Sequence, residues 1–182
     1  NYGYKINDKL KLENSLRYND SFLNYDTVNV SYGDEDTSTD DTQASNSLRL
    51  IFDNGNSKNT LFYNKYYTRR DTSDYTNKKL HYTGHRDSIN FVGEYNFNLD
   101  TKIVYGLDNE FDAANYQDDN LSEYLYSDEA IYSQYFDLQF RPFEKLYSTI
   151  GLRRDEHTTS EEAFTGRGTL AYKLDKNSKI RT

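Results

Sequence analysis

Apolar and polar side chains alternate along much of the chain, beginning with the segment from residue 10 to residue 18. Leucine or tyrosine stands at even-numbered positions there, and charged or hydroxyl side chains stand between them. Because successive side chains of a β-strand point to opposite faces, a period of two predicts strands with one apolar and one polar face. The predicted apolar face comprises Leu10, Leu12, Leu16, Tyr18, Ile89, Phe91, Tyr95, Phe97, Ile103, Tyr105, Leu107, Leu146, Ile150 and Leu152, and the polar face comprises Lys11, Glu13, Ser15, Arg17, Ser88, Asn90, Glu94, Asn96, Lys102, Asp108, Thr149 and Arg153.

One predicted strand, residues 59–69, does not divide into faces in this way. Its large apolar side chains occupy both parities, with Leu61, Tyr63 and Tyr67 on one and Phe62 and Tyr66 on the other. The alternation therefore leaves the facing of this strand open.

Short segments rich in Asn, Asp, Gly or Lys separate pairs of strands and favour hairpin turns. They are Asn7-Asp8-Lys9, Asp53-Asn54-Gly55-Asn56-Ser57, Asn98-Leu99-Asp100-Thr101, Pro142-Phe143-Glu144-Lys145 and Asp175-Lys176-Asn177-Ser178. The first four are about 44 residues apart, a spacing that also fits a propeller or solenoid repeat. The segments between them do not match in sequence, so only a plan recurs: short turn, long strand, long polar loop, long strand.

Long loops dominated by Asp, Ser, Thr, Asn and Glu are predicted between the turns. They cover Asp26 to Ser45, Arg70 to Lys78, Ala113 to Asp128 and His157 to Glu162. Such lengths are unusual in compact domains, whereas outer-membrane barrels combine tight turns at one end with long loops at the other. We therefore expect an all-β fold, an antiparallel up-and-down transmembrane β-barrel, of which this chain supplies roughly ten strands of a larger barrel.

The composition fits a membrane barrel better than a water-soluble core. Only 35% of residues are hydrophobic and the mean hydropathy is −1.03, which leaves little apolar area to offset chain entropy. Disorder is the competing interpretation, but disordered chains are poor in aromatics and this one has 19 Tyr and 10 Phe. Two interpretations fit the tyrosine-rich positions: a ring at the membrane boundary of a barrel, or packing across a soluble sheet. The positions are Tyr63, Tyr66, Tyr67, Tyr132 and Tyr135.

Charge and chemistry exclude several function classes. The net charge of −8 and the lack of clustered Lys and Arg argue against nucleic acid. Without Cys there is no disulfide framework, and the sequence has no phosphate-binding loop, dinucleotide fingerprint or nucleophile elbow. We therefore expect no enzymatic activity.

Two polar groupings are candidates for metal chemistry. The segment from Asp34 to Asp41 concentrates the oxygen ligands that Ca²⁺ prefers, although its spacing is not that of an EF-hand and its composition alone favours a solvated acidic loop. His81 and His85 lie four apart on a predicted strand, about 13 Å, too far to share one metal. His157 beside Asp155 or Glu156 is an isolated pair that no second motif supports.

Residues 140–173 resemble the late barrel strands of TonB-dependent outer-membrane receptors. In that family a short turn leads to a strand ending in a Gly-x-Arg-x-Asp-like run, and the next strand returns toward an Ala-Tyr or Ala-Trp pair. The matching positions are Gly151, Arg153, Asp155, Ala171 and Tyr172. The first half is most similar to the vitamin B12 receptors, with Asn24-Tyr25-Asp26 closing one strand and Asp41-Thr42 reopening the next.

The resemblance implies energy-coupled uptake of a bulky, scarce nutrient, such as cobalamin or a metal chelate, across the bacterial outer membrane. It implies outer-membrane lipid as a partner, and TonB through an N-terminal plug region that residues 1–182 lack. In B12 receptors loop carboxylates bind Ca²⁺, and the matched positions are Tyr25, Asp26 and Asp41. A passive porin or structural barrel, which needs no plug, is the alternative, and the resemblance does not identify the residues that touch the substrate.

Overall fold

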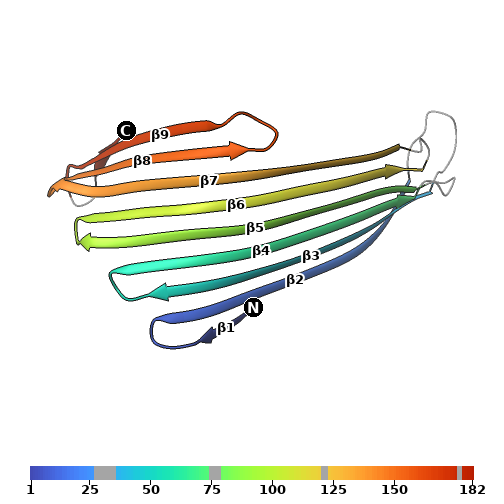
Figure 1. Ribbon diagram of the computed structural model, residues 1–182, viewed down its shortest axis with the longest axis horizontal. Helices are drawn as coiled ribbons and strands as arrows, with labels where there is room; N and C mark the ends of the chain where they lie inside the picture. The colour runs from blue at the N-terminus through green and yellow to red at the C-terminus, as the bar shows by residue number, and fades with distance from the viewer. Residues whose placement is uncertain (27–35, 74–78, 120–122, 176–177) are drawn as a thin grey trace.

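The computed structural model describes residues 1–26, 36–73, 79–119, 123–175 and 178–182, which form ten β-strands. The strands are β1 (Tyr2–Lys5), β2 (Leu10–Asp26), β3 (Asp36–Asp53), β4 (Ser57–Ser73), β5 (Lys79–Asn98), β6 (Thr101–Asp118), β7 (Glu123–Phe143), β8 (Leu146–His157), β9 (Ala163–Lys173) and β10 (Lys179–Arg181). They lie in one antiparallel sheet whose spatial order is the chain order (Figure 1). The predicted all-β, up-and-down architecture is confirmed, and the sheet is open, with β1 and β10 at its two edges. No helix in these ranges is long and apolar enough to cross a membrane.

The first four predicted turns all lie at one end of the sheet, between β1 and β2, β3 and β4, β5 and β6, and β7 and β8 (Figure 1). Side-chain carboxylates and amides close several of them: backbone N–H groups of Lys9, Gly55 and Asp100 donate to the residue two positions earlier at 2.8–2.9 Å. This is the turn chemistry that makes Asn and Asp frequent in hairpins. Gly55 has a φ of 90°, which a glycine adopts without strain.

The strands extend further than the sequence indicated. Residues 36–45, predicted as loop, belong to β3, and most of the predicted loop from Ala113 to Asp128 belongs to β6 and β7. The polar composition of these segments is typical of a loop, but they continue as β-strand because each pairs without interruption with the neighbouring strand. Strands β2 to β7 contain 17 to 21 residues, whereas a barrel strand needs about 9–11 to cross a membrane. Their loop ends therefore have the length to project beyond a bilayer.

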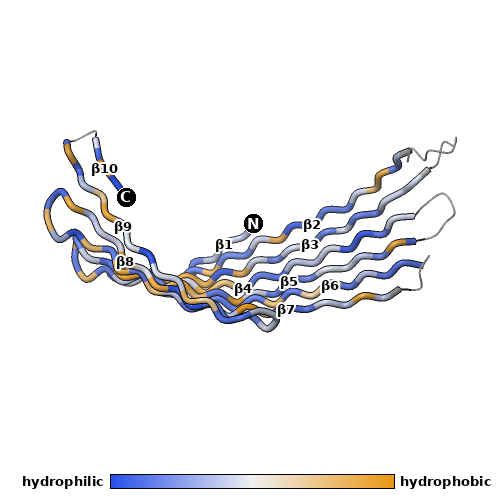
Figure 2. Tube along the Cα trace, turned by 90° about the horizontal axis from the view of Figure 1, so that it is seen from above, coloured by the Kyte–Doolittle hydropathy of each residue, from blue (hydrophilic) through white to orange (hydrophobic). Residues whose placement is uncertain are grey.

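Cross-strand register gives the sheet two chemically different faces. One, termed the apolar face, carries the paired residues Leu12 and Leu50, then Leu61, Phe91 and Leu107 on successive strands. The other, termed the polar face, carries the side chains of intervening positions, and the predicted division of strands into faces is confirmed. Apolar positions gather in the half of the curved sheet near the short turns, and hydrophilic positions dominate the opposite end (Figure 2).

Small side chains are buried on both faces of the sheet, whereas the large apolar side chains stay exposed. Among described residues, the buried hydrophobic side chains are Ala113 and Ala130, which have apolar-face parity, while Thr60, Ser88 and Ser133 are buried on the polar face. Large apolar side chains such as Leu107 and Ile89 are more than half exposed. A sheet that exposes its apolar face in this way needs a covering medium, because water would penalise each such side chain.

Candidate functional site

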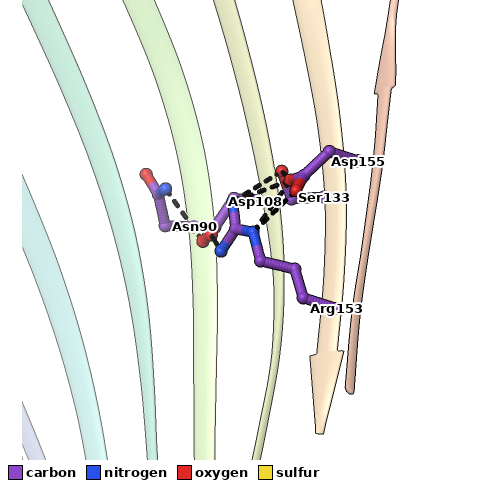
Figure 3. A network of polar contacts seen from close by, with 5 residues as sticks. All are labelled: Asn90, Asp108, Ser133, Arg153 and Asp155. Atoms are coloured by element: carbon purple, nitrogen blue, oxygen red, sulfur yellow. Dashed lines mark hydrogen bonds and ion pairs between the residues drawn. The ribbon is translucent and has the colours of Figure 1, made fainter. Parts of the chain in front are cut away.

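The most extensive side-chain constellation is a polar network centred on Arg153 (Figure 3). Its guanidinium donates from Nε to Oδ1 of Asp155 and from Nη2 to Oγ of Ser133, both at 2.9 Å. Ser133 in turn donates its hydroxyl to Asp155. Nη1 lies 3.7 Å from Oδ2 of Asp108, whose Oδ1 accepts a 3.0 Å hydrogen bond from Asn90. Four strands, β5 to β8, are thereby tied together on the polar face.

A second group of polar side chains extends this network to β3, because Asn64 also lies 3.5 Å from Asn90. The amide of Asn64 on β4 donates to the hydroxyl of Ser88 on β5 at 3.1 Å. Its carbonyl oxygen accepts from the hydroxyl of Ser47 on β3 at 2.6 Å. Buried hydroxyls and amides that satisfy one another in this way avoid the cost of an unpaired polar group.

The facing of β4, which the sequence left open, is settled by a cation on the polar face. The Arg49 guanidinium carbon lies 4.9 Å from the centroid of the Phe62 ring, and Arg49 also pairs with Glu13 at 3.3 Å. Phe62 and Tyr66 therefore belong to the polar face, while Leu61 belongs to the apolar face. A cation over the face of an aromatic ring is favourable, and this cation–π contact explains why an aromatic side chain lies among charged residues.

Two glycines let large side chains lie flat against the polar face. The ring of Tyr135 occupies the space that a Cβ on Gly106 would need, and the Asp137 carboxylate does the same at Gly151. Asp137 is held there by Arg167 on β9, with Nη2 to Oδ2 at 2.7 Å. The glycine of the Gly-x-Arg-x-Asp-like run thus makes room for a charged pair.

A cavity of about 430 Å³ opens on the polar face, nearer to the loop ends of the strands. Its lining includes Tyr66, Tyr82, Gly84, Ala114 and Ser127, from β4, β5, β6 and β7. None of these positions was singled out from sequence as a binding residue. The available signals were tyrosines on the polar parity and small residues opposite one another, and only cross-strand register aligns them.

The residues predicted for calcium are not drawn into one cluster by the described structure. Asp41 pairs with Ser21, four positions along β2 from Tyr25, a backbone separation of about 13 Å. Its carboxylate accepts from Arg70, with Nη2 to Oδ2 at 2.6 Å, and from Gln43 at 3.2 Å. The hydrogen bond from Arg70 lowers the pKa of Asp41. Asp41 is therefore a carboxylate at neutral pH, held by an internal cation.

The third residue, Asp26, pairs with Asp36 at the end of β2, and residues 27–35, with Asp34 and Glu35, lie outside the described residues. Within the described ranges, no three His, Cys, Asp or Glu residues are placed to hold a metal. The calcium site stays a prediction.

The histidines make pairwise contacts on separate strands. His81 contacts Asp71, with Nδ1 to Oδ1 at 2.8 Å, and the His85 ring lies 5.8 Å from that of Phe111. His157 contacts Glu129 at 3.2 Å rather than its sequence neighbours. These contacts are those of structural or rim residues.

The boundary interpretation of the tyrosines is wrong for two of the five. Tyr63, Tyr67 and Tyr132 have apolar-face parity, but Tyr66 lines the polar-face cavity and the Tyr135 ring lies 5.8 Å from Arg153. The sequence alone did not show on which face each tyrosine lies. An odd or even position assigns a side chain to a face only once the orientation of its strand in the sheet is known.

Comparison with solved structures defines the class of fold. The sheet has the same fold as the barrel sheets of solved outer-membrane transporters. The crystal structure of the outer membrane transporter YddB from Escherichia coli matches 94% of this chain with a TM-score of 0.73 at 8% identity. The RagAB peptide importer in its open-open state matches 93% with a TM-score of 0.70 at 11% identity.

The matched parts are 28% of each of those chains, so this chain spans little more than a quarter of their length. At such low identity the likeness shows the fold alone. No protein-family model matches the sequence, and a search of curated proteins finds no significant relative.

Proposed function

We propose that this chain forms part of the wall of an outer-membrane transporter that takes up a bulky nutrient. The single observation that carries the proposal is the chemical division of the sheet. Its apolar face has the exposed leucines and aromatics that lipid would cover, and its polar face has the hydrogen-bonded charges that water in a lumen would surround.

The finer proposal is energy-coupled uptake in the manner of TonB-dependent receptors. Its support is the resemblance of residues 140–173, in which Gly151, Arg153 and Asp155 all lie on the polar face. The resemblance also makes cobalamin or a metal chelate the expected substrate and TonB the expected partner. A passive porin would share the two-faced sheet, and a plug domain in the full-length protein is the feature that distinguishes the two.

The wall assignment is tested by cysteine labelling of the full-length protein in intact cells. Single cysteines are placed at Gly55 in a short turn and at Thr159 in a connection at the opposite end. A membrane-impermeant maleimide should label the Thr159 site on whole cells and the Gly55 site only after the outer membrane is opened. Labelling of Gly55 alone on whole cells would overturn the proposed orientation.

We also propose that Ca²⁺ binds near Tyr25, Asp26 and Asp41 in the full-length receptor. Because Arg70 holds Asp41, a calcium ion must compete with that guanidinium. Arg70→Gln should therefore raise calcium affinity, while Asp26→Asn with Asp41→Asn should lower it. Titration calorimetry measures both, with Arg154→Gln as the control for loss of one exposed arginine. An unchanged affinity in the double variant would refute the site.

A further inference from the structure

The cavity on the polar face is a trough built by cross-strand register. Thr68, Gly84, Ala114 and Ser127 are successive partners across β4, β5, β6 and β7, so four small side chains form one transverse row. Neighbouring strands lie about 4.8 Å apart, which makes this row about 14 Å long. A row of small side chains between larger ones leaves a depression that crosses the strands.

Larger side chains stand on both sides of this row. On the side toward the short turns, Tyr66, Arg86, Asp112 and Glu129 are successive cross-strand partners. On the side toward the loops, Tyr82 leans over the floor, since a Cβ at Gly84 would lie 3.1 Å from its hydroxyl. The trough therefore has a tyrosine at each side and a charged row along one wall.

The two tyrosines offer both ring surface and hydroxyl groups to a ligand. Tyr66 is 39% exposed and Tyr82 is 42% exposed, so their rings are accessible above the floor. Such amphipathic rings bind flat ligands whose faces are apolar and whose rims carry hydroxyl groups. Thr68 and Ser127 add two hydroxyls to the lining.

The charges of the wall decide which ligands are acceptable. Arg86 is held by Asp112 through two 2.6 Å contacts, from Nε to Oδ1 and from Nη2 to Oδ2, and Glu110 lies 3.4 Å from Nη1. Its positive charge is therefore neutralised within the wall, and Glu129 leaves the lining with an excess of negative charge. An anionic ligand would be repelled there, whereas carboxylates readily accept hydrogen bonds from neutral hydroxyls.

We propose that this trough is a binding subsite for a neutral saccharide unit of the transported nutrient. The inference rests on the proposed function, because the polar face must line the lumen for a nutrient to reach the trough. The sugar ring would lie against Tyr66 or Tyr82, with its hydroxyls toward Asp112, Glu129 and Ser127. Gly84 and Ala114 would form the floor beneath that ring.

The test uses the purified full-length receptor in detergent and titration calorimetry. The neutral probes are maltohexaose and cellotetraose, the anionic probe is trigalacturonic acid, and cyanocobalamin is included as the competing ligand. Ala114→Leu fills the floor, and Tyr66→Ala removes one ring without adding bulk. Thr169→Leu is the control, since Thr169 pairs with Thr149 outside the trough on the same face.

We expect a neutral probe to bind, trigalacturonic acid to bind at least tenfold more weakly, and both trough variants to lower neutral-probe affinity at least tenfold. Thr169→Leu should leave that affinity within twofold of the parent value, and circular dichroism should show that all variants fold. Tyr66→Ala keeps the test decisive if Ala114→Leu misfolds.

Absence of neutral-probe binding, or binding that neither trough variant weakens, would overturn the saccharide site. Binding of cyanocobalamin that is tighter than saccharide binding and is lost in both variants would also overturn it. These outcomes are separable from the wall assignment, which depends on the labelling pattern of Gly55 and Thr159 and on no ligand.

Discussion

The two faces of the sheet reverse the arrangement of a water-soluble protein. On the apolar face, Leu61, Ile89 and Leu107 remain between two-fifths and three-fifths exposed. On the polar face, Ser133 is 2% exposed within the contacts of Arg153 and Asp155. Polar side chains thus enclose one another on one face, while the large apolar side chains of the other face are left for a surrounding medium.

This contrast explains how a chain with 35% hydrophobic residues can form such long strands. Backbone pairing satisfies the N–H and C=O groups along each ladder, and the charged side chains of the polar face pair with one another. No thick apolar core is needed if lipid covers the other face. The following substitutions test that explanation, beginning with the largest expected effect.

Adjacent residues of β4 provide the sharpest test. In the full-length protein refolded into lipid vesicles, Leu61→Arg should lower the free energy of unfolding by about 2–4 kcal/mol, the cost of a charge on the lipid side near the bilayer midplane. Phe62→Arg should cost less than about 1 kcal/mol, because its side chain lies on the polar face and only the ring contact with Arg49 is lost. Urea titration measures both, and equal losses would contradict the assignment of faces.

Glycines of the apolar face provide a test of packing. The Tyr105 ring fills the space beside Gly93, and its hydroxyl donates to Asn59 at 3.1 Å. Gly93→Ala should therefore cost about 1–3 kcal/mol by displacing that ring. Gly168→Ala is the matched control, because nothing lies within 4 Å of a Cβ there. If the two variants unfold at the same urea concentration, the ring is not packed against Gly93.

The smallest expected effect concerns the ion pairs. A double-mutant cycle of Arg153→Met and Asp155→Asn should give a coupling of at most about 1 kcal/mol, since Arg153 is 44% exposed and solvent screens the pair. The more exposed pair of Arg154 and Glu162 should give a value nearer zero. A larger coupling in the exposed pair would show that the network around Ser133 adds nothing to stability.

Much of the fold follows from local sequence patterns. Alternation placed Ile89, Phe91 and Leu107 on one face, because a strand's side-chain period is fixed by backbone geometry. The short turns were predicted correctly because Asn and Asp bond their own backbone within two or three residues. The turn near Pro142 is narrower than predicted: β7 continues to Phe143 through an irregularity in the ladder, which accommodates a residue without an N–H group.

The long polar segments illustrate where local patterns stop being informative. Residues 36–45 contain the Asp, Ser and Thr typical of loops, yet they form strand because β2 and β4 pair with them on both sides. Strand formation there depends on partners 10 to 35 residues away, and nothing in the composition of the segment itself identifies those partners.

The functional surface was decided by tertiary structure for the same reason. Phe62 acquires its facing from Arg49, and the trough requires Gly84 and Ala114 to stand opposite each other, 30 positions apart in the chain. Sequence determined that two faces exist, since alternation is a property of each strand alone. Register determined which residues share a face with which neighbours, because it couples strands whose pairing is set by the whole sheet.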